Sequence, residues 1–128
     1  MVADAGAVSV VAGEPSLINY LDALNGWQLV VEAGGVAGRP AAASFKHVSP
    51  AGVATACEVD ATAGETWAVA AVVEGLRSAY IRARDADPKS SFGDVVAVSH
   101  PVTNDLAQCL TGTITDAIIA PATSRAPW

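Results

Sequence analysis

Apolar residues recur at two different spacings along this 128-residue chain, and the two spacings alternate. Residues 17–33 repeat apolar side chains three, four and seven positions apart, which is the period of a helix. Residues 41–48 form a short, mostly apolar run, which is typical of a strand. Residues 1–13 alternate small and apolar side chains and predict one short strand before the helix. The first half of the chain is therefore predicted to be strand, helix and strand.

The helix predicted over residues 17–33 has an apolar face and a glycine in its interior. The face consists of Leu17, Leu21, Leu24 and Val31. Glycine inside a helix costs roughly 1 kcal/mol relative to alanine, so we expect a tertiary contact to hold the helix at Gly26. The glycine-rich residues 34–38 are expected to end it.

The second half of the chain continues the alternation. Thr62 and Glu65 have the spacing of a capping box, and they predict a helix that extends to Arg84. The further predicted elements are a strand over 94–99, a helix over 103–110 and a strand over 117–120. Strands that alternate with helices predict an α/β domain of three layers, with a mainly parallel sheet and helices on its faces.

The charge balance narrows the possible ligands. The net charge is -6 with a pI near 4.6, and the seven basic residues are scattered, which argues against a nucleic-acid partner. An anionic small molecule stays possible, because a few local donors can hold one against an unfavourable overall field. No apolar run reaches the roughly 18 residues of a membrane span, and no basic flank of a signal peptide is present at the start. We expect a cytoplasmic protein without a membrane partner.

Lys46 and His47 are the first candidate site residues. They end the strand predicted over 41–48 and precede a Ser-Pro-Ala-Gly segment that predicts a turn. The carboxyl end of a strand is where open α/β sheets place ligands. A lysine there can hold an anion, and a histidine can move a proton near neutral pH. The alternative is a surface lysine beside a structural histidine.

Two further candidates come from loops. Gly93 lies in the Ser-Ser-Phe-Gly-Asp loop before the strand predicted over 94–99, where a ligand could approach the backbone closely. Asp116 lies at the start of the last strand, where a carboxylate could accept hydrogen bonds from ribose hydroxyls. The alternatives are an ordinary turn at Gly93 and a turn or cap residue at Asp116.

Several motifs of other protein classes are missing. No H-x-E or C-x-x-C pair occurs, so the ligands of a zinc deaminase are absent and no metal is expected. No G-x-S-x-G occurs, which argues against a serine hydrolase of that type. The glycines of residues 34–38 follow a helix and lack G-K-[ST], so they do not form a phosphate loop.

Five segments taken together resemble one family in one order. They are INYLDALNGWQLV at 18–30, SFKHVSPAG at 44–52, AYIRAR at 79–84, SSFGD at 90–94 and ITDAIIAP at 114–121. They look like the transformylase region of the AICAR transformylase/IMP cyclohydrolase family of purine biosynthesis. The resemblance covers about residues 17–121. Ala117 departs from it, since the family usually has glycine there, and the sequence of residues 54–64 is unlike the family's.

The resemblance implies formyl transfer from the co-substrate 10-formyltetrahydrofolate to the 5-amino group of AICAR, without a metal. His47 would accept the proton of the amine, and Lys46 would stabilise the tetrahedral transition state. Gly93 and Asp116 match positions that bind AICAR. The family's region is built from cytidine-deaminase-like units without zinc, and its active site forms in a homodimer.

The family's transformylase region is far longer than this chain. Residues 1–128 are therefore expected to be a partial transformylase domain, with the cyclohydrolase domain and the folate-contacting segments absent. The alternative, from another class, is a non-catalytic α/β module that keeps the family scaffold for nucleotide binding or dimerisation.

Overall fold

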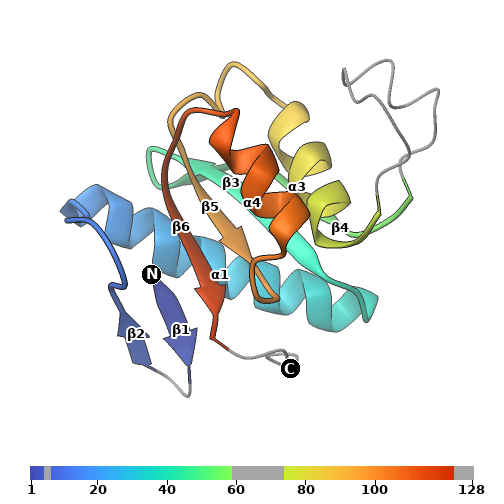
Figure 1. Ribbon diagram of the computed structural model, residues 1–128, viewed down its shortest axis with the longest axis horizontal. Helices are drawn as coiled ribbons and strands as arrows, with labels where there is room; N and C mark the ends of the chain where they lie inside the picture. Colours follow the sequence, from blue (N-terminus) through green and yellow to red (C-terminus); the bar gives the residue numbers. More distant parts are fainter. Residues whose placement is uncertain (5–6, 59–73, 123–128) are drawn as a thin grey trace.

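The computed structural model describes residues 1–4, 7–58 and 74–122, and its architecture is α/β (Figure 1). The elements are β1 (Val2–Asp4), β2 (Ala7–Ser9), α1 (Leu17–Ala37), β3 (Ala41–Lys46), β4 (Ser49–Thr55), α3 (Gly75–Asp85), β5 (Asp94–Val98), α4 (Asn104–Thr111) and β6 (Thr115–Pro121). No helix in the described ranges is long and apolar enough to cross a membrane.

The elements form three layers around one six-stranded sheet of order β2-β1-β6-β5-β3-β4. Helix α1 covers one face, and α3 and α4 cover the other (Figure 1). The core under α1 joins Ala23 and Val30 of the helix to Phe45, Val95 and Ile119 of the sheet. On the other face, Leu76, Tyr80 and Leu106 pack against Val96 and Val98. The predicted layering is confirmed, and the neighbouring strands β3 and β5 are buried along almost their whole length.

The sheet is mixed, so the prediction of a mainly parallel sheet is wrong. Strands β5 and β6 are parallel, as are β1 and β6. Strand β3 is antiparallel to both β4 and β5, and β1 is antiparallel to β2. The cause is the strand β4, whose first residues were predicted to form only a turn. Because β4 returns the chain along β3, the next strand enters the sheet in the opposite direction to β3.

Strand β4 was missed because it begins with turn-forming residues. Ser49, Pro50 and Gly52 lie in the strand itself, and Lys46 pairs with Ser49 across a two-residue turn. β4 is an edge strand, where a proline costs no ladder hydrogen bond that the sheet needs. The pairing shifts register between Ser44 and Phe45, which accommodates one extra residue opposite them.

Helix α1 runs further than expected and faces differently. Ser16 and Asn19 form a reciprocal capping box, and Gly38 ends the helix in the left-handed conformation. The expected contact at Gly26 is confirmed: a Cβ built there would lie 2.9 Å from Ala97 Cβ. The predicted apolar face, however, is turned to solvent, and Leu17 is 74% exposed.

Most of the other predicted elements exist with shifted ends. The predicted strands over 94–99 and 117–120 correspond to β5 and β6, and the predicted helix over 103–110 corresponds to α4. The first thirteen residues hold two strands rather than one. The helix predicted to run up to Arg84 does not continue through Glu74, whose backbone is extended. The capping box at Thr62 and Glu65 lies outside the described residues.

Candidate functional site

Lys46 is the last residue of β3, and its side chain bridges to the neighbouring strand. Its Nζ donates a hydrogen bond of 2.7 Å to the carbonyl oxygen of Gly93, in the loop that leads into β5. The antiparallel pairing of β3 with β5 brings the end of one strand beside the start of the other. Lys46 is half-buried, so its ammonium group is fixed in place and still reachable by a small ligand.

Gly93 lies close to two other candidate residues, Lys46 and Asp116. Its backbone has φ of +67°, which glycine adopts without steric cost, and its N–H donates to the carbonyl oxygen of Ile114 at 2.9 Å. A Cβ built on Gly93 would lie 2.9 Å from Lys46 Nζ and 3.6 Å from Asp116 Oδ1. Lys46 and Asp116, which are far apart in sequence, therefore both lie close to the position that a Gly93 side chain would take.

His47 lies beside this cluster at the tip of the β3–β4 hairpin. His47 and Val48 are the two turn residues, and both have positive φ, at 53° and 61°. Two-residue hairpin turns of this hand normally use Asn-Gly, because side chains are disfavoured there. For the β-branched Val48 the conformation is a genuine outlier. The imidazole of His47 is thus presented on a short, strained and exposed turn.

A hollow of about 650 Å³ opens next to the hairpin tip. It is lined by Lys46, His47, Ser49, Pro50, Ala51, Asp87, Lys89 and Ser90. The two lysines and the histidine make this hollow a better place for an anionic group than the acidic surface as a whole. Lys46 and His47 both line it.

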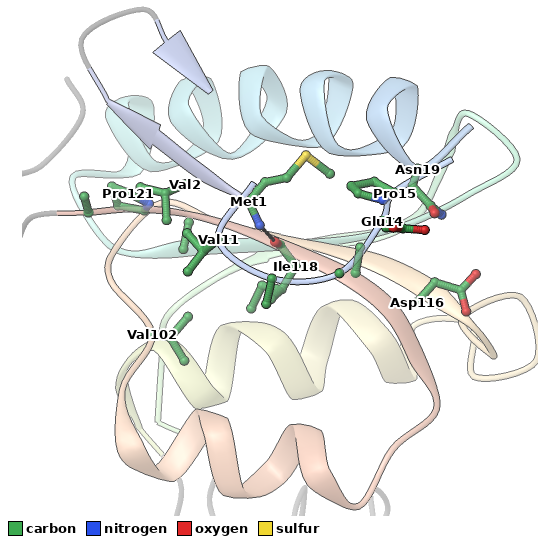
Figure 2. A pocket seen from close by; sticks show the side chains of 15 residues that line it. Met1, Val2, Val11, Glu14, Pro15, Asn19, Val102, Asp116, Ile118 and Pro121 are labelled. Atoms are coloured by element: carbon green, nitrogen blue, oxygen red, sulfur yellow. Dashed lines mark hydrogen bonds between the residues drawn. The ribbon is translucent and has the colours of Figure 1, made fainter. Parts of the chain in front are cut away.

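Asp116 borders a different cavity, of about 660 Å³. Figure 2 shows Asp116 at one end of this cavity, while Val11, Ile118 and Val102 lie further along it. The N-terminal amino group donates to the carbonyl oxygen of Ile118 within the cavity at 2.7 Å, and burial lowers the pKa of that amine. Lys46 and Asp116 therefore both lie close to Gly93, but they line different hollows.

A buried polar network lies directly under Gly93. Ser44 Oγ donates to Asp94 Oδ2 at 2.6 Å, and Thr115 Oγ1 donates to Asp94 Oδ1 at 3.0 Å. Burial raises the pKa of the Asp94 carboxyl, and the two hydroxyl hydrogen bonds partly oppose that shift. Ser91 joins the network through a 2.9 Å contact with Ser44 Oγ. The network ties together the ends of β3, β5 and β6 that carry the candidate residues.

The cluster lies at the predicted end of β3, but the neighbouring strands run in a direction that was not expected. Lys46 is at the carboxyl end of β3, as predicted. Because β3 is antiparallel to β5, the same edge holds the amino ends of the parallel strands β5 and β6. Ligands of open α/β sheets usually bind at the carboxyl ends of parallel strands, and this site does not follow that rule.

Two residues of the site were not found from the sequence. Asp94 was predicted only as the first residue of a strand, and Asp22 only as part of a helix. Asp22 is buried, and its Oδ1 accepts from the backbone N–H of Val48 at 2.6 Å. The available signal was its spacing, because Asp22 lies four and eight positions before Gly26 and Val30 on the buried face.

The arrangement suits a small polar ligand. It offers an ammonium group and a carboxylate close to Gly93, with an imidazole on the adjoining turn. Within the part of the chain that the structure describes, no group of three His, Cys, Asp or Glu side chains could hold a metal ion. The groups present are ones that interact through charge and hydrogen bonds.

Comparison with known proteins assigns the family. The family model described as the AICARFT/IMPCHase bienzyme matches residues 2–127. The bifunctional purine biosynthesis protein PurH of Deinococcus deserti is 41% identical over 113 residues, and that of Deinococcus radiodurans is 40% identical over 113 residues. Each alignment covers 88% of this chain and 19% of the relative. The protein of the same name from Elusimicrobium minutum is 30% identical over 108 residues, or 84% of this chain and 17% of the relative.

The chain therefore belongs to the AICARFT/IMPCHase bienzyme family, as the sequence resemblance predicted. It spans about a fifth of the length of the curated relatives that it matches.

Proposed function

We propose that this chain carries the Lys46–His47 part of an AICAR transformylase site. The reaction is formyl transfer from 10-formyltetrahydrofolate to the 5-amino group of AICAR, in the formation of IMP. We propose that the scaffold of this site is a cytidine-deaminase-like unit without zinc, as in the family's transformylase region. The chain's membership of the bienzyme family supports this assignment.

The proposed roles follow from the chemistry of formyl transfer. The amine of AICAR is a weak nucleophile until it loses a proton, and His47 would accept that proton. The attacked formyl carbonyl develops negative charge, and the ammonium group of Lys46 would stabilise it. Asp116 would accept hydrogen bonds from the ribose hydroxyls, and the backbone at Gly93 would contact AICAR directly.

One observation carries the proposal: Lys46 and Asp116 lie against the same glycine. Lys46 Nζ is bonded to Gly93 O at 2.7 Å, and Asp116 Oδ1 lies 3.6 Å from the position that a Gly93 Cβ would take. The family resemblance pointed to Lys46, Gly93 and Asp116 separately, from three different segments of the sequence. Their convergence around Gly93 is what a shared ligand requires.

We further propose that the chain alone holds only part of the site. It spans about a fifth of its relatives, so further AICAR contacts and the folate contacts are assigned to segments outside it. Fewer contacts mean weaker binding and poorly positioned reactants. The isolated chain is expected to bind AICAR weakly and to transfer formyl groups slowly or not at all.

Calorimetric titration with AICAR tests the proposal. The wild-type chain should release or absorb heat on binding, and His47→Ala should weaken the affinity. Arg39→Ala serves as the control, since Arg39 is an exposed basic residue that lines neither hollow. Equal affinity of wild type and His47→Ala, or weakening by Arg39→Ala alone, would count against the assignment.

A second candidate function is a non-catalytic module that retains the scaffold for dimerisation. The observation that favours it is the solvent-facing stripe of α1, where Leu17, Leu21 and Leu24 are 74%, 40% and 41% exposed. A helix that is apolar on its outer face is usually covered by a neighbour. Sedimentation analysis distinguishes the two candidates, because a stable dimer without AICAR binding would favour the module.

A further inference from the structure

We infer that Asp22 is a positioning residue that holds the His47–Val48 turn in its left-handed conformation and so fixes the place of the His47 imidazole. The inference rests on the proposed function, in which His47 accepts a proton. Asp22 lies on α1, and the turn lies between β3 and β4. The contact therefore joins the helix layer to the hairpin that carries the candidate base.

The contact is short, and the side chain that accepts it is buried. Asp22 Oδ1 lies 2.6 Å from the backbone nitrogen of Val48, and Asp22 is only 3% exposed. Hydrogen bonds to an ionised acceptor are roughly twice as strong as those between neutral groups. A buried carboxylate costs free energy unless it is hydrogen-bonded, so the Val48 N–H and the Asp22 carboxylate each satisfy the other.

The turn needs such a restraint because its residues disfavour its conformation. His47 has φ of 53° and Val48 has φ of 61°. A side chain in this region costs roughly 1–2 kcal/mol per residue, and Val48 is branched at Cβ. Without the bond to Asp22, the turn would relax toward ordinary backbone conformations, and the imidazole of His47 would move with it.

Helix α1 is well placed to provide a rigid anchor. One turn after Asp22, Gly26 lets the helix approach the sheet so closely that a Cβ there would lie 3.3 Å from Phe45 Cδ1. Phe45 directly precedes Lys46 and is itself buried. Asp22 therefore reaches the hairpin tip from a helix that is packed against the same strand, so its carboxylate has little freedom to follow a moving turn.

The experiment compares Asp22→Ala with wild type in the full 128-residue chain by NMR. Loss of a hydrogen bond to a carboxylate should speed amide hydrogen exchange at Val48 by about tenfold or more. The imidazole resonances of His47 should shift, because the turn has relaxed. Exposed Glu32 on the same helix provides the control, and Glu32→Ala should change neither signal.

Two further variants separate positioning from general stability. Asp22→Asn keeps a neutral acceptor and should give a smaller change, and it replaces Asp22→Ala if that variant does not fold. Adding Val48→Gly to Asp22→Ala should return the His47 resonances toward wild type, since glycine adopts positive φ freely. A general loss of packing under α1 would not be repaired by a change at the hairpin tip.

AICAR titrations of the same variants complete the test. Asp22→Ala should weaken binding, and the added Val48→Gly should recover part of the loss. If the wild-type chain binds no AICAR, the proposed function fails, while the Val48 exchange and the His47 resonances still decide the role of Asp22. Unchanged exchange at Val48 and unchanged His47 resonances in both Asp22 variants would overturn the inference.

Discussion

Gly93 is the residue on which the site depends most closely. Its positive φ turns the chain so that its carbonyl oxygen meets Lys46 and its N–H meets Ile114. Any side chain there would enter the space between Lys46 Nζ and Asp116 Oδ1. The local backbone conformation and the open space for a ligand therefore have the same cause.

Replacing Gly93 with alanine is expected to damage both stability and binding. The left-handed backbone should cost roughly 1–2 kcal/mol of unfolding free energy for a residue with a Cβ. The Cβ would also displace Lys46 Nζ, which lies 2.9 Å away, and AICAR affinity should fall. Gly38→Ala is the control, since Gly38 has a similar φ of +64° with nothing within 4 Å. Denaturation should show similar losses in both variants, and calorimetry should show weakened binding only in Gly93→Ala; equal binding would contradict the role of Gly93.

Asp94 makes stability depend on pH in a predictable direction. Burial raises the pKa of its carboxyl, so the folded state holds the proton more tightly than the unfolded state, whose value is about 3.9. The contribution of Asp94 to stability is therefore lost as pH rises from about 4 through the raised pKa. Asp94→Asn removes this titration, so urea denaturation should show the variant gaining on wild type as pH rises. A difference that stays constant over that range would contradict the raised pKa.

At the scale of the elements, α1 shows why periodicity alone misjudged which side of a helix is buried. The fully buried positions are occupied mostly by small or polar residues: Asp22, Ala23, Gly26, Val30 and Gly34. Leu17, Leu21 and Leu24 point outward. Close approach to the sheet at Gly26 leaves no room for a side chain at that position. The glycine itself was a better guide to the packed face than the leucines.

Two glycines of α1 should respond to substitution in opposite ways. Gly26→Ala adds a Cβ 2.9 Å from Ala97 Cβ, and overpacking of this kind typically costs about 1–3 kcal/mol, more than the gain in helix propensity of roughly 1 kcal/mol. Gly35→Ala, at an exposed position, should gain up to about 1 kcal/mol. Urea denaturation of both variants checks the pair. Stabilisation by Gly26→Ala would show that α1 does not pack so closely.

Strand order and direction are the parts of the fold that the sequence did not reveal. The strands β3, β5 and β6 and the helices α1 and α4 followed from apolar runs and glycines, because those signals are local. Strand β4 carries Pro50 and Gly52, which are turn residues in most contexts and are tolerated here at the edge of the sheet. Missing one strand reversed the expected direction of β5 relative to β3. Likewise, Lys46, His47, Gly93 and Asp116 were nominated from the sequence, whereas the supporting Asp22 and Asp94 required the tertiary contacts to be seen.

At the scale of the whole molecule, described helices cover both faces of the sheet, but the outer surface of α1 is unusually apolar. Leu17, Leu21 and Leu24 follow one stripe that faces solvent. A chain that spans about a fifth of its relatives is expected to expose surface that a neighbour covers in the longer proteins. The exposed stripe and the partial site thus lead to the same proposal, that this chain acts together with other segments or copies.

Charge placed on the α1 stripe should reduce association without unfolding the chain. Leu21→Lys together with Leu24→Lys should lower the binding of a hydrophobic dye and the sedimentation coefficient at high concentration. Both positions are exposed, so unfolding free energy should change by no more than about 0.5 kcal/mol per substitution. Gln28→Lys, one turn further along and also exposed, is the matched control. Unchanged dye binding and unchanged sedimentation would show that the stripe takes no part in association.

The central claim is that Lys46, His47, Gly93 and Asp116 form one AICAR site, and NMR mapping of AICAR binding tests it most directly. The account predicts that the amide signals of these four residues move together along one saturation curve as AICAR is added. Residues 104–111 of α4, which line neither hollow, should move less. Shifts confined to residues 104–111, or no shifts in any residue at millimolar AICAR, would contradict it.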